Sequence, residues 1–298
     1  MKVKHCKGEQ GTTSRTCLKR TLVMAFDILL FLFLFLLVYS LFGFLFSVLV
    51  PADEGSMTVR QLLFMADELF LLLAAVFSSW LVLRIRGLSF SILGLRVKGY
   101  SKDLWKGALF ALSFYALSFV ISLLSGSVEV VSVSFPLSSL LMSFLFFGLV
   151  AVFEELALRG FVLGRMLEAG VNKFVALFLS SLLFSLLHLA NPNFAVLPFI
   201  NILLAGVMLG ASYIYTRNLC FPIALHWLWN WLQGPVLGYE VSGNRFGESL
   251  LSLRLSGSEW MSGGDFGFEG SLLCTVMMLA GTFIIMRMEK GKLRIDNG

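Results

Sequence analysis

The stretch SSLLMSFLFFGLVAVFEELALRGFVLGRMLE, residues 138–168, decides how this chain folds. It is long and apolar enough to form a helix that crosses a lipid bilayer. Yet Glu154, Glu155 and Arg159 stand near its middle. Charged groups at membrane depth are costly, and they persist chiefly where they line a cavity or take part in chemistry. The stretch therefore predicts a membrane fold and, within it, the position of a functional site.

The composition of the whole chain agrees with a membrane fold. Of its 298 residues 58% are apolar and only 14% are charged, and 30 are Phe. Apolar runs bounded by Gly, Pro, Asn or charged residues predict an all-α fold, a polytopic transmembrane helical bundle. We expect about eight membrane helices, over residues 22–49, 61–83, 106–125, 138–168, 174–190, 195–215, 220–235 and 271–287.

The basic residues indicate how this bundle is oriented. If the N-terminus is cytoplasmic, most of the 23 Lys and Arg fall on the cytoplasmic side, and only Arg60, Arg245 and Arg254 fall outside. This bias predicts an even number of membrane helices with the N- and C-termini both cytoplasmic, because a seven-helix count puts a basic cluster on the wrong side. The net charge of +5 is thereby explained, and we expect no nucleic-acid partner.

The chain divides into a basic cytoplasmic tail over residues 1–20 and a single membrane-embedded domain over residues 21–298. Residues 84–106 mix basic and aromatic side chains, which predicts a connector on the cytoplasmic surface. Residues 236–270 form a Gly-rich outer loop before the final helix at 271–287. Aromatic residues in this loop favour an ordered cap over a disordered linker.

The positions of Glu154 and His188 along their helices predict that the two side chains lie at one depth. The short turn 169–173 joins their helices into an antiparallel hairpin. Each residue lies roughly 25 Å along its own helix from the middle of that turn. A carboxylate and an imidazole at one depth can share a water and deprotonate it. His188 and Phe184, taken singly, fit simple packing equally well.

The spacing of charges separates the roles of the two adjacent acids. Glu155 and Arg159 are four residues apart with the acid first, the favourable order for an ion pair on one helix face. Glu154 is turned about 100° away on the same helix. We therefore expect Glu155 to be a structural acid neutralised by Arg159, and Glu154 to be the catalytic base. The alternative is that both acids merely anchor a contact between helices.

His226 and Asn230 are also four residues apart and share one face of a later helix. An imidazole N–H and an amide N–H from consecutive turns can donate two hydrogen bonds to one oxygen, as an oxyanion requires. The same two residue types also bridge membrane helices by hydrogen bonds. From the spacing alone, both interpretations stay open.

Three short motifs follow one another on successive apolar helices, namely Glu154-Glu155-x-x-x-Arg159, Phe184-x-x-x-His188 and His226-x-x-x-Asn230. Together they resemble the signature motifs of the CAAX-protease and bacteriocin-processing (CPBP, also called Abi) family of intramembrane glutamic endopeptidases. The resemblance covers about residues 90–235, which would form the catalytic core. None of the signature positions is substituted.

The resemblance implies a peptidase in which Glu154 and His188 activate the hydrolytic water. It also implies that His226 and Asn230 stabilise the tetrahedral intermediate. The motif residues that would support this site are Glu155, Arg159 and Phe184. The expected partners are the lipid bilayer and a membrane-associated peptide or protein substrate, and the expected location is the cell membrane of a prokaryote. Neither prenylation of the substrate nor the oligomeric state can be read from the sequence.

Two alternatives to this hypothesis remain. Glu154, His188 and His226 could serve as three zinc ligands with water in the fourth place. However, the chain has no His-Glu-x-x-His motif, and a zinc-bound His226 could not also hold an oxyanion. We therefore expect no metal or other cofactor. The second alternative is a non-catalytic membrane scaffold, immunity protein or transporter. Asp67 and Glu68 would suit a transporter, although the internal repeats typical of transporters are not evident.

Overall fold

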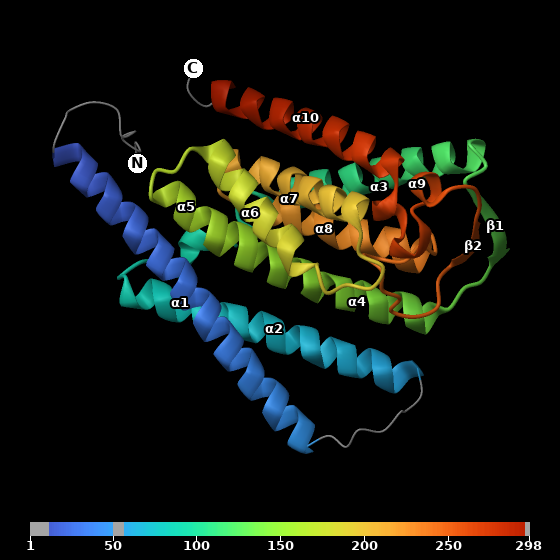
Figure 1. Cartoon of the computed structure of the whole chain (residues 1–298), viewed down its shortest axis with the longest axis horizontal. Coiled ribbons are helices and arrows are strands. Elements are labelled where there is room, and N and C mark those ends of the chain that lie inside the picture. Colours follow the sequence, from blue (N-terminus) through green and yellow to red (C-terminus); the bar gives the residue numbers. More distant parts are fainter. Residues whose placement is uncertain (1–11, 50–56, 296–298) are drawn as a thin grey trace.

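The computed structural model describes residues 12–49 and 57–295, which form a bundle of helices with one small sheet (Figure 1). The long helices are α1 (Thr12–Leu49), α2 (Met57–Ile85), α3 (Ser101–Leu124), α4 (Leu137–Glu154), α6 (Lys173–Leu187), α7 (Val196–Thr216), α8 (Cys220–Trp231) and α10 (Leu272–Ile295). The short helical elements are η1 (Phe90–Leu93), η2 (Glu155–Leu163), α5 (Gly164–Glu168), η3 (Leu232–Val236), α9 (Glu259–Ser262), η4 (Gly264–Phe266) and η5 (Phe268–Gly270).

Within the described part of the chain, five helical segments are long and apolar enough to cross a membrane, namely Leu18–Val48, Val59–Ile85, Ser101–Leu124, Leu137–Glu168 and Val196–Thr216. Two apolar helical segments, Lys173–Leu187 and Leu272–Met288, are shorter. The chain is therefore a multi-pass integral membrane protein built as a helical bundle. The total of eight membrane helices and the cytoplasmic placement of both termini stay predictions. In Figure 1, the start of α1 and the end of α10 lie at the same end of the bundle, as an even number of crossings requires.

The packing order places the motif-bearing helices in the interior. α8 packs against both α3 and α4, α7 packs against α6 and α10, and α1 and α2 pack on each other (Figure 1). α1 is the most peripheral of the membrane-crossing segments, with only 6% of its most apolar window buried. Its exposed Leu and Phe side chains suit contact with lipid. The polar motif residues are thereby kept away from the hydrocarbon.

The hairpin that carries Glu154 and His188 owes its shape to its turn. Asn172 caps the start of α6, because its side-chain Oδ1 accepts a hydrogen bond of 3.0 Å from the backbone N–H of Phe174. Gly170 precedes it with a φ of +88°, in the left-handed region that favours glycine. The antiparallel hairpin expected from the sequence is therefore present.

Several expected boundaries are wrong. α1 begins at Thr12 rather than residue 22, so the end of the expected tail is helical, and residues 1–11 of that tail lie outside the described residues. α3 begins at Ser101 rather than residue 106, because the left-handed turn at Gly99 already ends the connector. α6 ends at Leu187 rather than residue 190, which leaves His188 as the residue that follows the helix.

A second difference concerns helix type. The expected continuous helix 138–168 is present, but its part Glu155–Leu163 (η2) is a π-helix between α4 and α5. The expected helix 220–235 likewise ends in the π-helical turn η3, which contains Pro235. Because π-turns are rare and often occur at functional sites, the coincidence of η2 with the first motif supports that motif's importance.

The outer loop is folded against the bundle. Its strand β2 (Leu251–Leu255) pairs antiparallel with β1 (Val128–Val133), which departs locally from the all-α expectation. The buried Asn201 on α7 holds the end of the loop, since its Nδ2 donates to the carbonyl oxygens of Glu269 (2.7 Å) and Ser271 (2.9 Å). These contacts position the end of the loop next to α7, which packs against the motif-bearing helices α6 and α8.

Candidate active site

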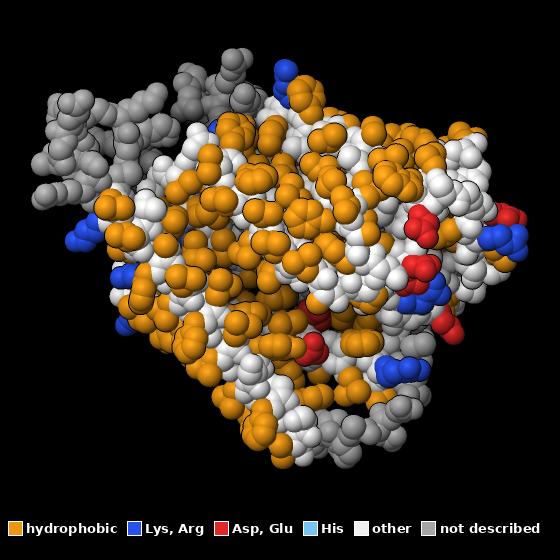
Figure 2. Space-filling model, viewed as in Figure 1, with side chains coloured by type: hydrophobic (Ala, Val, Ile, Leu, Met, Phe, Trp, Pro, Cys, Tyr) orange, Lys and Arg blue, Asp and Glu red, His pale blue; other side chains and the backbone are white. Residues whose placement is uncertain are grey.

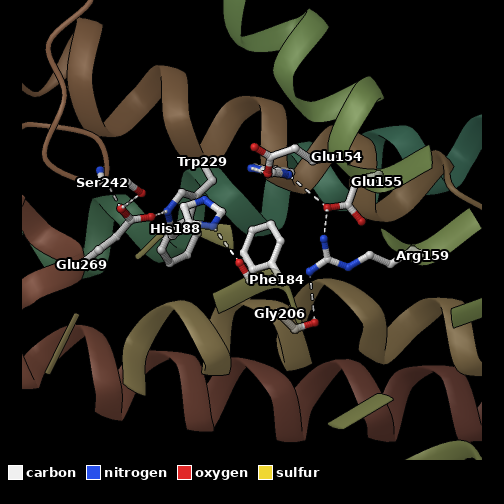
Figure 3. Close-up of polar contacts among 10 residues, drawn as sticks. Glu154, Glu155, Arg159, Phe184, His188, Gly206, Trp229, Ser242 and Glu269 are labelled. Atoms are coloured by element: carbon white, nitrogen blue, oxygen red, sulfur yellow. Dashed lines mark hydrogen bonds and ion pairs between the residues drawn. The ribbon is translucent and has the colours of Figure 1, made fainter. Parts of the chain in front are cut away.

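The expected ion pair between Glu155 and Arg159 is present in the π-helix. Arg159 Nη1 lies 2.9 Å from Glu155 Oε1, and both side chains are at most 1% exposed. Arg159 also donates from Nη2 to the carbonyl oxygen of Gly206 on α7 at 3.2 Å, and its guanidinium lies 4.4 Å from the centre of the Phe184 ring. Figure 3 shows Arg159 reaching from Glu155 toward Gly206. Arg159 thus joins the first motif to α6 and α7.

His226 contacts both acids of the first motif. Its Nδ1 lies 3.0 Å from Glu155 Oε1, and its Nε2 lies 3.7 Å from Glu154 Oε2. Because a carboxylate only accepts hydrogen bonds, Nδ1 carries a proton and donates it to Glu155. Glu155 Oε1 therefore accepts from Arg159 and His226 together. The four-residue spacing predicts only the first of these partners, because His226 lies on a different helix.

His188 is oriented by its own helix end. Its Nδ1 lies 2.8 Å from the carbonyl oxygen of Phe184, which can only accept, so Nδ1 is protonated. In the neutral imidazole, Nε2 is then free to accept a hydrogen bond from a water. The Phe184 ring packs against the imidazole with a centroid separation of 4.6 Å. Phe184 also makes an edge contact with His226, at a centroid separation of 6.2 Å, so its ring contacts both imidazoles.

Glu154, His188, His226 and Asn230 all line one cavity with a volume of about 490 Å³. The depth argument from the sequence is thus compatible with the structure, although no direct contact joins Glu154 to His188. Asn230 is 6% exposed and its side chain makes no hydrogen bond to any described residue. Its amide is therefore available to a group that enters the cavity.

The remaining wall of the cavity is strongly apolar. It contains aromatic side chains from α1, α2 and α4, among them Phe35, Phe64, Phe146, Phe147 and Phe153. Figure 2 shows acidic side chains in a hollow that is surrounded mainly by apolar side chains. An apolar surround excludes water and strengthens electrostatic interactions with any group bound inside.

Glu269 is a cavity residue to which the sequence analysis assigned no role. It is 3% exposed, and its carboxylate accepts hydrogen bonds from Trp229 Nε1 (3.0 Å) and from Ser242 N (2.9 Å) and Oγ (2.8 Å). Figure 3 shows Glu269 between Trp229 and Ser242, on the side of the site that holds His188. Its position in a Gly- and Phe-rich segment directly before α10 was the one available signal. Glu269 attaches the outer loop to the helix that carries His226 and Asn230.

Glu68 on α2 is a second carboxylate at the cavity that received no role. It lines the same cavity as Glu154, whereas the adjacent Asp67 accepts a hydrogen bond of 2.9 Å from Tyr39 on α1. The two acids of α2 therefore lie in different environments, Glu68 at the cavity and Asp67 against α1. Of the two acids that the transporter alternative cited, only Glu68 lines the cavity.

The zinc alternative can be compared with the arrangement of the ligating side chains. Among the residues that the structure describes, no group of three or more His, Cys, Asp or Glu side chains converges as a metal ion requires. The hydrogen bonds of His226 Nδ1 to Glu155 and of His188 Nδ1 to Phe184 leave one nitrogen of each ring for other partners. The described site is therefore a set of acid, base and amide groups around an apolar cavity.

The fold brings carboxyl, imidazole and amide groups together at one cavity in a helical membrane bundle. Residues 136–232, roughly a third of the chain, match the family model described as Type II CAAX prenyl endopeptidase Rce1-like. This segment contains all three motifs, and the family of the matching model is of the CPBP type that the motifs resemble. The match indicates a peptidase. No match was found among curated proteins or among solved structures.

Proposed function

We propose that this protein is an intramembrane endopeptidase that hydrolyses a peptide bond of a membrane-associated peptide or protein. The observation that carries the proposal is the shared cavity, which brings Glu154, His188, His226 and Asn230 together inside the segment that matches the peptidase family. Peptide hydrolysis needs a base for water and donors for the developing oxyanion. These four side chains can supply both.

Glu154 and His188 are the proposed water-activating pair. Glu154 is the more exposed acid of its motif, with a side chain 20% exposed against 0% for Glu155. It is therefore open to the cavity, while Glu155 is occupied by Arg159 and His226. His188 presents Nε2 as an acceptor, because its Nδ1 is held by the carbonyl oxygen of Phe184. A water between them would be deprotonated and would attack the scissile carbonyl.

His226 and Asn230 are the proposed oxyanion donors. Nδ1 of His226 already donates to Glu155, so Nε2 donates to an oxyanion only when the ring is an imidazolium. The carboxylates of Glu154 and Glu155 lie 3.7 Å from Nε2 and 3.0 Å from Nδ1 of this ring. The amide of Asn230, one turn later on α8, would supply the second hydrogen bond.

The surroundings support a substrate that approaches within the membrane. The cavity wall on α1, α2 and α4 is aromatic, and the hollow lies on an apolar face (Figure 2). An apolar segment of a peptide would bury its surface there without losing hydrogen bonds to water. Prenylation of the substrate is not required by this arrangement. The cell membrane of a prokaryote stays the expected location.

The proposed mechanism uses no metal and no other cofactor. Its proton transfers are assigned to Glu154 and His188, and its charge stabilisation to His226 and Asn230. Zinc held by Glu154, His188 and His226 is the alternative, and it would take His226 away from the oxyanion. The two versions differ in their response to chelators.

The experiment compares wild-type protein with Glu154→Gln on a library of membrane-anchored peptides, with products identified by mass spectrometry. We expect the wild type to cleave a subset of the peptides and Glu154→Gln to cleave none. Asp67→Asn is a matched control, because it removes another membrane-embedded carboxylate that is bonded to Tyr39. If wild type and Glu154→Gln give identical profiles, a scaffold, immunity protein or transporter is favoured.

A further inference from the structure

The cavity is lined by a further, half-buried carboxyl group that the proposed mechanism has not used. Glu68 comes from α2, outside the segment that matches the family model, and it lines the cavity together with Glu154. Its Oε2 is buried and has no hydrogen-bond partner in the described part of the chain, and the same holds for Glu154 Oε2. Both carboxyl groups belong to residues that line the same apolar space. A buried carboxyl oxygen without a partner calls for a functional explanation.

The neighbouring Asp67 shows that the placement of Glu68 is specific. Asp67 Oδ1 accepts a hydrogen bond from Tyr39 at 2.9 Å and is not part of the cavity wall. Successive residues of a helix point in directions about 100° apart. α2 therefore directs one acid toward α1 and the other into the cavity.

Two carboxyl groups in one apolar cavity cannot both ionise without a large cost, so one of them retains its proton. Glu154 has the stabilising neighbour, since His226 Nε2 lies 3.7 Å from it. The other charged or titratable groups at the cavity are engaged elsewhere. Arg245 binds Glu240, Glu269 accepts from Trp229 and Ser242, and His188 binds the Phe184 carbonyl. The proton therefore resides on Glu68.

We propose that Glu68 is the general acid that protonates the leaving amine. This inference rests on the proposed peptidase function and completes its proton transfers. Glu154, with His188, takes a proton from water as the water oxygen bonds to the scissile carbonyl carbon. The carbon–nitrogen bond then breaks as Glu68 donates its proton to the nitrogen. After the products leave, Glu154 returns its proton to Glu68, and both groups regain their starting states.

The test separates proton donation from every other role of Glu68. The substrates are one library peptide that the wild type cleaves and its thioester analogue, in which sulfur replaces the scissile nitrogen. A thiolate leaves without being protonated, so only the peptide needs a general acid. Because general acid–base catalysis contributes typically 10²–10⁴-fold, Glu68→Gln should cut peptide turnover at least about a hundredfold. Thioester turnover should change less than about threefold.

Two control variants accompany this measurement. Asp67→Asn should leave the turnover of both substrates unchanged, because Asp67 faces Tyr39. Glu68→Asp should recover part of the peptide turnover, because it restores a carboxyl group. Retained thioester turnover also shows that Glu68→Gln is folded.

Two results would overturn the assignment of Glu68. Equal losses on both substrates would make Glu68 a binding or structural residue, and unchanged peptide turnover would remove it from the reaction. The proposed function is judged separately from these outcomes. It fails if the wild type leaves all peptides intact, or if Glu154→Gln cleaves them as the wild type does.

Discussion

Nδ1 of His226 lies 3.0 Å from Oε1 of Glu155, although the two residues are 71 positions apart in the chain. The same oxygen accepts a hydrogen bond from Arg159 at 2.9 Å. Glu155 therefore holds the imidazole in one orientation, with its other nitrogen directed toward Glu154. This contact links the first motif to the third. The two adjacent acids therefore differ in their contacts. Glu155 is bonded to His226 and Arg159, whereas Glu154 is open to the cavity.

The first prediction concerns folding. Glu155→Gln or Arg159→Ala should lower the yield of folded protein in detergent, because either change leaves a buried charge without its partner. Breaking such a pair typically costs about 3–5 kcal/mol. Glu154→Gln should give a near-normal yield and a near-normal thermal midpoint. Equal losses in all three variants, measured by size-exclusion chromatography and thermal unfolding, would contradict the division of roles.

The second prediction concerns the oxyanion. Asn230→Ala should bind peptide with near-normal affinity and cleave it at least about a hundredfold more slowly. Loss of one oxyanion donor typically costs 10²–10³ in rate, or about 3–4 kcal/mol, and it acts in the transition state. Binding and single-turnover cleavage, measured separately, check this. Weaker binding with normal turnover at saturating peptide would instead make Asn230 a substrate contact or a helix bridge.

The third prediction concerns metal ions. Activity should persist after prolonged treatment with phenanthroline, because Glu154 and His188 activate water without a metal in the proposed mechanism. Elemental analysis of the active protein should find well under one zinc per chain. Inactivation by the chelator that added zinc reverses would instead assign Glu154, His188 and His226 as ligands.

The fourth prediction concerns the outer loop. Trp229→Phe keeps an aromatic ring but removes the indole N–H that donates to Glu269, so the wall of the cavity beside Asn230 should shift. Because small displacements of catalytic groups are costly, we expect turnover to fall about tenfold or more. Peptide cleavage rates under saturating conditions provide the measurement.

Trp227→Phe is the matched control for this change. It removes a similar indole hydrogen bond, 2.7 Å to the carbonyl oxygen of Phe144, from a residue outside the cavity wall. Turnover should stay within about twofold of the wild type. Similar losses in both variants would show that the effect comes from general packing of α8 and not from Glu269.

The membrane class, the resemblance to a peptidase family and the Glu155–Arg159 pair followed from the amino-acid sequence by itself. They depend on local features, namely the length of apolar runs, the order of three motifs and a four-residue spacing on one helix. The helical hairpin was also predictable, because a short turn leaves its two helices no other arrangement. The π-helical form of residues 155–163 was not, since a π-turn leaves no periodic pattern of its own.

Only the tertiary structure decided which distant groups meet. His226 contacts Glu155 because α8 packs against α4, and Glu269 reaches Trp229 because Asn201 holds the end of the outer loop. Glu68 lines the cavity because of the way α2 is rotated about its own axis. A rotation of about 100°, the angle between successive residues of a helix, would have placed Asp67 there instead. Such contacts depend on how whole helices pack, and the free energy of packing is spread over many side chains that no short motif records.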